Sequence, residues 1–155
     1  MSGGAEPLYD LAAAREPEQL ARMERLERER ICIFCPEHRE REHPQPVEHV
    51  GEHWWVTRNA FPYPGAEHHY LIVAQRHVTA FDQLPDAAGA ELWAIKRMLK
   101  ERHAPLATAT VERSGDMRFN GGSVAHLHTH FVVLAAEPAT TVRFRVSARA
   151  AGDAR

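Results

Sequence analysis

The chain has 155 residues, a length that suits one compact domain. Its hydrophobic fraction of 44% and charged fraction of 26% are those of an ordinary globular protein, and its net charge of −2 argues against a strongly basic nucleic-acid-binding surface. No stretch approaches the roughly 18 consecutive apolar residues of a membrane span, and the N-terminus has no secretory hydrophobic core. We therefore expect a cytoplasmic protein that binds neither nucleic acid nor membranes.

The first expected element is a charged helix over residues 17–30. Leu20, Met23 and Leu26 recur every three residues among many charges. This spacing predicts a narrow apolar stripe, lying on the surface of the domain or against a partner subunit. Residues 36–46 are charged and contain proline, which indicates a loop.

Alternating and β-branched runs in the rest of the chain predict strands. The expected strands are residues 53–59, 69–74, 108–113, 125–134 and 141–146. The first two are separated by a turn-rich segment and form an expected antiparallel pair. The main helix falls within residues 79–103 and is expected to begin near Asp86, whose side chain could cap it. Together these elements predict an α+β fold, an antiparallel sheet with helices on one side.

The most informative pattern is the run His126-Leu127-His128-Thr129-His130. In a strand the three histidines point to one face, and the residues between them point to the other. Three imidazoles on one face of a buried strand are hard to explain by packing, because each desolvated ring needs hydrogen-bond partners. Chance spacing and a structural metal site that uses all three histidines are the alternatives to catalysis.

The segment before this run favours catalysis. Asn120-Gly121-Gly122-Ser123 is a tight loop with small side chains, and it can turn backbone N–H groups and a hydroxyl toward an anion. A loop of this kind leading into a histidine-bearing strand predicts a phosphate site beside a nucleophile.

Cys32 and Cys35 have the spacing of metal ligands, since two thiolates separated by two residues can bind one tetrahedral zinc ion. His38 and His43 could complete the site, although they follow Cys35 more closely than in small zinc modules. A redox pair and two unligated thiols remain alternatives. Two cysteines so close together cannot join distant parts of a fold, which favours a reducing compartment.

Residues 121–133 closely resemble the signature of the histidine-triad family of nucleotide hydrolases and transferases. Residues 59–65, with the strand that follows them, resemble the family's nucleoside-binding turn. The resemblance covers residues from about 30 to 146 and implies a five-stranded antiparallel sheet with helices packed on it, usually in a homodimer. It divides the chain into an N-terminal extension with a charged helix at 1–30, a histidine-triad domain at 31–146 and a tail at 147–155.

The resemblance also implies the chemistry. His128 would attack the α-phosphorus of a nucleotide derivative, such as a dinucleoside polyphosphate or a nucleoside phosphoramidate of a purine. Water, phosphate or another acceptor would then release the nucleotide from this nucleotidyl-histidine, with His130 as the second catalytic residue. A neutral imidazole is a good nucleophile near neutral pH. The residues expected to bind the nucleotide and its phosphate are Asn59, Asn120, Gly121, Gly122, Ser123 and His130.

Some members of the family, and the related galactose-1-phosphate uridylyltransferases, bind zinc through positions that match Cys32, Cys35, His77 and His126. The resemblance therefore implies a structural Zn²⁺ held by these four residues. Many members carry glutamine where this chain has Gly122, so a side-chain amide that assists the leaving group is not expected here.

Two other functions compete with this interpretation. A nucleotide-binding or scaffold protein could retain the pocket with little turnover. A zinc-dependent hydrolase could use the three histidines as catalytic ligands, but it would lack a nearby carboxylate base, since Glu137 lies seven residues beyond His130.

Overall fold

The computed structural model describes residues 5–137 and 139–146 and contains one five-stranded antiparallel sheet in the order β1-β2-β3-β5-β4. The strands are β1 Val47–Val50, β2 Trp54–Arg58, β3 Ala66–Ala74, β4 Thr108–Glu112 and β5 His128–Leu134. The α-helices are α1 Pro17–Glu29, α2 Pro36–Glu42, α3 Asp86–His103 and α4 Met117–Asn120, with short 3₁₀ turns at Leu11–Ala13 and Phe81–Gln83. The predicted α+β class and the antiparallel five-stranded sheet are confirmed.

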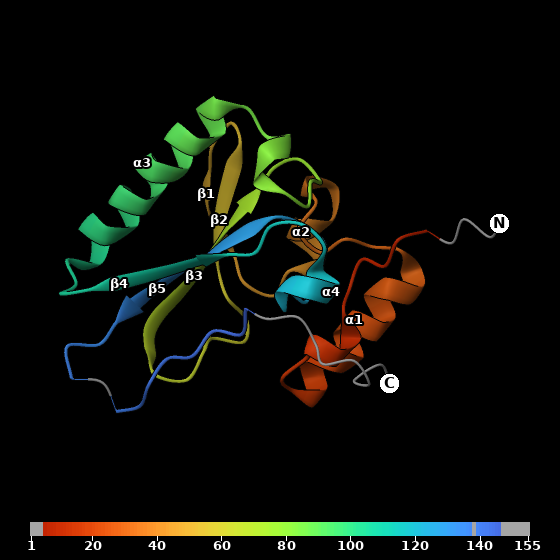
Figure 1. Ribbon diagram of the computed structural model, residues 1–155, viewed down its shortest axis with the longest axis horizontal. Helices are drawn as coiled ribbons and strands as arrows, with labels where there is room; N and C mark the ends of the chain where they lie inside the picture. Colours follow the sequence, from red (N-terminus) through yellow and green to blue (C-terminus); the bar gives the residue numbers. More distant parts are fainter. Residues whose placement is uncertain (1–4, 138, 147–155) are drawn as a thin grey trace.

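The sheet separates two hydrophobic cores, because side chains alternate between its faces. On one face Leu127 and Phe131 pack with Ile95 and Leu99 of α3. On the other face the N-terminal segment and the segment that carries the cysteines cover Trp55, Leu71 and Val73. Figure 1 shows α3 on one side of the sheet, and α1 and α2 on the opposite side, away from α3. Helices therefore cover both faces of the sheet, whereas the sequence predicted one.

The apolar stripe of α1 is buried in its own chain. Met23 is 4% exposed and Leu26 is 1% exposed, both within the second core. Of the two predicted positions for this stripe, the domain's own surface or a partner subunit, the structure shows the first, since this face of the helix packs into the second core. None of the helices in the described part of the chain is long and apolar enough to cross a membrane.

Two predicted elements differ in the structure. The segment predicted as a loop contains α2, because Pro36 occupies its first turn, where a missing N–H costs nothing. Residues 141–146 were predicted as the fifth strand but form no strand. The fifth strand of the sheet is instead β1, an edge strand that pairs with β2. In that segment the carbonyl of Arg145 accepts hydrogen bonds from the Arg113 side chain instead of a strand partner.

The predicted start of the main helix is confirmed, because α3 begins at Asp86. The predicted cap is wrong, since Pro85 is the N-cap and no side chain caps the helix. Strand β5 begins only at His128, so His126 precedes the strand. The backbone before it is tied to the N-terminal segment, because the Ala125 N–H donates to the Leu8 carbonyl at 2.8 Å.

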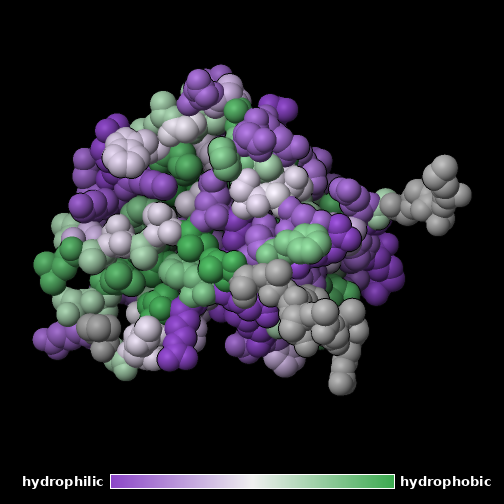
Figure 2. Space-filling view, in the orientation of Figure 1, coloured by the Kyte–Doolittle hydropathy of each residue, from purple (hydrophilic) through white to green (hydrophobic). Residues whose placement is uncertain are grey.

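One end of the sheet carries exposed hydrophobic surface. Strand β4 is an edge strand, and Leu106, two residues before it, is 87% exposed. Figure 2 shows hydrophobic residues gathered around this β4–β5 end, while the rest of the visible face is largely hydrophilic.

Candidate active site

A cavity of about 560 Å³ lies on the sheet face opposite α3. This volume is typical of small-molecule sites. Its walls come from the N-terminal segment, the turn at residues 59–65, the loop before β5 and the segment at 140–145. Of the residues predicted from the sequence, the cavity is lined by Asn59, Gly121, Ser123, His128 and His130. Asn120 and Gly122 lie beside it, around a much smaller neighbouring cleft.

The His128 ring is held in one tautomer. Its Nδ1 lies 2.7 Å from the carbonyl oxygen of His126. A carbonyl can only accept, so Nδ1 carries the proton and Nε2 of the neutral ring keeps its lone pair. Burial lowers the pKa of His128 to about 4, so the ring stays neutral at neutral pH. The sequence could not reveal this acceptor, because a backbone carbonyl leaves no side-chain trace.

His130 belongs to a pair of buried imidazoles. Its Nδ1 lies 2.8 Å from Nε2 of His69, and its Nε2 lies 3.1 Å from Nη1 of Arg113. Burial holds the pKa of His130 well below its usual range, so this ring is neutral as well. Tyr63 stacks on the His130 ring, with centroids 5.4 Å apart and planes 18° apart.

His69, Arg113 and Tyr63 were not predicted as site residues. The pairing register of β3 with β5 shows that His69 lies near His130. His69 lies two residues before Leu71, which pairs with His130, so both imidazoles occupy the same face of adjacent strands. Arg113 follows the end of β4, and no local pattern in the sequence marks it.

The loop before β5 depends on its glycines. Gly121 has φ +77°, and a Cβ on it would lie 2.9 Å from the Arg145 carbonyl oxygen, so a side chain there would be strained. The Gly122 N–H already donates to Oδ1 of Asn120 at 2.9 Å. Asn59 likewise closes its own turn, with Oδ1 accepting from the Phe61 N–H at 2.9 Å.

The buried neutral histidines predict a loss of stability in acid. Burial lowers the pKa of His69 to about 3, from 6.5 for the free side chain. Between these values the unfolded chain binds more protons than the folded one, so the free energy of unfolding falls as pH falls. We expect the urea midpoint to drop between about pH 7 and pH 5, and to drop less in His69→Gln. Equal pH dependence in the two proteins would contradict this, and His49→Gln on edge strand β1 is the matched control.

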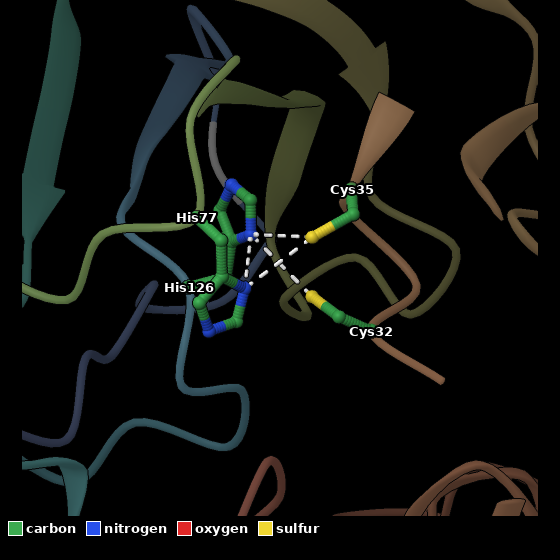
Figure 3. A group of neighbouring side chains, drawn as sticks. All are labelled: Cys32, Cys35, His77 and His126. Atoms are coloured by element: carbon green, nitrogen blue, oxygen red, sulfur yellow. Dashed lines mark hydrogen bonds between the residues drawn. The ribbon is translucent and has the colours of Figure 1, made fainter. Parts of the chain in front are cut away.

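A second group of side chains lies beside the triad. The ligand atoms of Cys32, Cys35, His77 and His126 all lie within 4.8 Å of one another. Figure 3 shows these four side chains pointing toward one another. Nδ1 of His126 lies 3.2 Å from Nδ1 of His77 and 3.4 Å from Sγ of Cys32. The Cys35 Sγ lies 3.3 Å from His77 and 3.7 Å from His126.

These separations fit a tetrahedral zinc ion. Zn–S distances of about 2.3 Å and Zn–N distances of about 2.05 Å place two nitrogens about 3.3 Å apart, and sulfur and nitrogen about 3.5 Å apart. The Nε2 of His126 donates to the Ala74 carbonyl at 2.7 Å, which turns Nδ1 toward the sulfurs. The hydrogen bond with Cys35 lowers the pKa of Cys32 and favours a thiolate there. His38 and His43 do not belong to this group in the described part of the chain.

The family model described as "Scavenger mRNA decapping enzyme C-term binding" matches residues 31–143, well over half of the chain. These residues include the whole histidine run and both cysteines. The chain belongs to the histidine-triad family.

Solved structures of histidine-triad proteins share its fold. A histidine-triad protein from Clostridium difficile aligns with a TM-score of 0.54 and 20% identity, over 71% of this chain and 96% of that one. A HIT family hydrolase from Clostridium thermocellum gives 0.55 and 19%, over 68% and 91%. A zinc-bound histidine-triad family protein from Mycobacterium smegmatis gives 0.55 and 17%, over 75% and 82%. None of the curated proteins compared with the chain matches it.

Proposed function

We propose that this histidine-triad protein hydrolyses or transfers a nucleoside monophosphate group, with His128 as the nucleophile. The single observation that carries the proposal is the hydrogen bond from Nδ1 of His128 to the His126 carbonyl, at 2.7 Å. It leaves an unprotonated Nε2 on a ring that lines the cavity. Membership of the histidine-triad family and the structural likeness to the Clostridium thermocellum HIT family hydrolase support the same class of reaction.

The proposed reaction has two displacements. The Nε2 lone pair of His128 attacks the α-phosphorus, a P–N bond forms, and the bond from phosphorus to the leaving group breaks. The leaving group departs with the electron pair of that bond and takes a proton. Water, phosphate or another acceptor then attacks phosphorus, and the P–N bond breaks to return the electron pair to Nε2. His130 and Ser123 line the same cavity and would contact the phosphate oxygens, and Asn59 would contact the ribose.

We further propose that the Cys32, Cys35, His77 and His126 group holds a structural Zn²⁺. Two thiolates and two imidazoles fill a tetrahedral set and leave no open position for a substrate. This ligand set argues against a zinc-dependent hydrolase that uses all three histidines of the triad as ligands, because only His126 of the triad belongs to the set. The zinc would tie the segment before α2 and the turn after β3 to the start of the reactive strand.

The homodimer stays a prediction from the family resemblance. The apolar stripe on α1 no longer supports a dimer, because Met23 and Leu26 are buried in their own chain. The edge strand β4, with the exposed Leu106 before it, is the better candidate for a dimer interface. The alternative of a nucleotide-binding scaffold with little turnover is weakened by the pre-set tautomer of His128, which binding alone does not require.

The test is intact-protein mass spectrometry after brief mixing with adenosine 5′-phosphoramidate or diadenosine tetraphosphate. A neutral or alkaline quench is needed, because acid cleaves P–N bonds. We expect wild type to gain the mass of one nucleoside monophosphate group, and His128→Ala to gain none. The covalent route would be contradicted if wild type turned over the substrate without ever carrying the adduct, and if this turnover persisted in His128→Ala.

A further inference from the structure

The cavity carries an excess of positive charge. Its described lining includes no aspartate or glutamate but five arginines, namely Arg15, Arg22, Arg113, Arg143 and Arg145. Among the described residues only one of these five forms an ion pair with a carboxylate, that of Arg22 with Glu18 at 3.4 Å. A concave site lined by uncompensated cations attracts anions, more strongly the greater their charge.

Two of these arginines converge on the ring that stacks on His130. The Arg15 guanidinium lies over the Tyr63 ring, 4.5 Å from its centroid, and donates to the Phe61 carbonyl. The Arg113 guanidinium lies 3.4 Å from the Tyr63 hydroxyl and 3.1 Å from Nε2 of His130. After burial and the neighbouring histidines, the charges of both arginines lower the pKa of His130. Like charges gathered here without a carboxylate indicate a place for a bound anion.

The hydrogen bonds of the imidazole pair point the same way. Two neutral rings carry two protons, and only one can lie in the 2.8 Å contact between His69 and His130. The other must sit on Nδ1 of His69 or on Nε2 of His130. The first faces the Tyr63 N–H at 3.1 Å and the second faces Arg113 at 3.1 Å, so in either case at least one donor meets another.

An anionic oxygen would remove the conflict between His130 and Arg113. The Tyr63 N–H is fixed by its turn, whereas the Arg113 guanidinium can swing on its side chain by giving up its hydrogen bonds to the Arg145 carbonyl. An oxygen placed between Nε2–H of His130 and Arg113 would accept from both. Phosphate suits the position, because arginine donates to it in a charge-assisted and often bidentate manner.

We propose that Arg15 and Arg113 form a subsite for a second phosphate group, the one that leaves when His128 attacks the first. This inference rests on the proposed role of His128 as the attacking group. It predicts that nucleoside polyphosphates are preferred to nucleotides with a single phosphorus atom. Arg15 precedes the residues that match the family model, 31–143, so this chain's N-terminal segment supplies half of the subsite.

Equilibrium binding tests the subsite without requiring turnover. The affinities of ATP and AMP, both without magnesium, are measured for wild type, Arg15→Ala and Arg113→Gln. We expect wild type to bind ATP about tenfold or more tightly than AMP, and each variant to reduce this ratio about tenfold. Arg28→Ala is the matched control, because Arg28 is an exposed arginine of helix α1, which follows Arg15 in the chain, and it does not line the cavity. It should keep the wild-type ratio.

Two results would overturn the subsite. One is equal affinity of wild type for ATP and AMP. The other is an ATP-to-AMP ratio that Arg15→Ala and Arg113→Gln leave unchanged. Failure of the proposed function is distinguishable, since it appears as absence of the His128 adduct while the ATP preference and its loss in the variants persist.

Discussion

Replacement of His128 by alanine is expected to lower turnover of a nucleoside phosphoramidate or dinucleoside polyphosphate by about 10³-fold or more. A covalent nucleophile has no substitute in the site, because the neighbouring His130 is engaged with His69 and Arg113. The fold should survive, since the His128 ring lines the cavity wall and its removal enlarges a space that already exists.

Steady-state kinetics and nucleotide binding together check this prediction. Binding of AMP should change little in His128→Ala, because Asn59 and Ser123 still line the cavity. His49→Ala on edge strand β1 is the control for loss of an unrelated histidine. Undiminished turnover in His128→Ala would remove the nucleophile assignment, and equal loss of binding and turnover would favour the scaffold interpretation.

Removal of one zinc ligand is expected to release the metal and lower the melting temperature by roughly 10 °C or more, because zinc binding feeds directly into folding free energy. Elemental analysis should find one zinc per chain in wild type and none in Cys32→Ser. Cys32, His77 and His126 lie on three separate segments, so loss of the ion should loosen the start of β5. Low residual activity is expected in the variant, because His128 is outside the ligand set.

His38→Ala and His43→Ala are the matched controls, since these histidines also follow the cysteine pair in the sequence. Both variants should keep the metal, and His38→Ala should also keep the melting temperature. A metal-free wild type that is fully active and indifferent to strong chelators would exclude the zinc site. If the double variant with His77→Ala and His126→Ala still binds zinc, the proposed ligand set is wrong.

The sequence by itself determined the features that depend on local periodicity and spacing. The alternation from His126 to Phe131 set which side chains face each core, and the helical spacing of apolar residues set α1 and α3. The separation of Cys32 and Cys35 marked half of the proposed zinc-ligand set, but its completion by His77 and His126 came from family resemblance.

Only the tertiary structure decided which distant segments meet. Val47–Val50 pairs with β2 although no pattern marked it, and residues 141–146 take no strand partner. Arg15 and Arg113 lie 98 positions apart in the chain yet converge on Tyr63. The tautomer of His128 is set by a backbone carbonyl, which every residue has. Such contacts depend on strand pairing and on the path of the N-terminal segment over the sheet, and neither leaves a trace in local sequence.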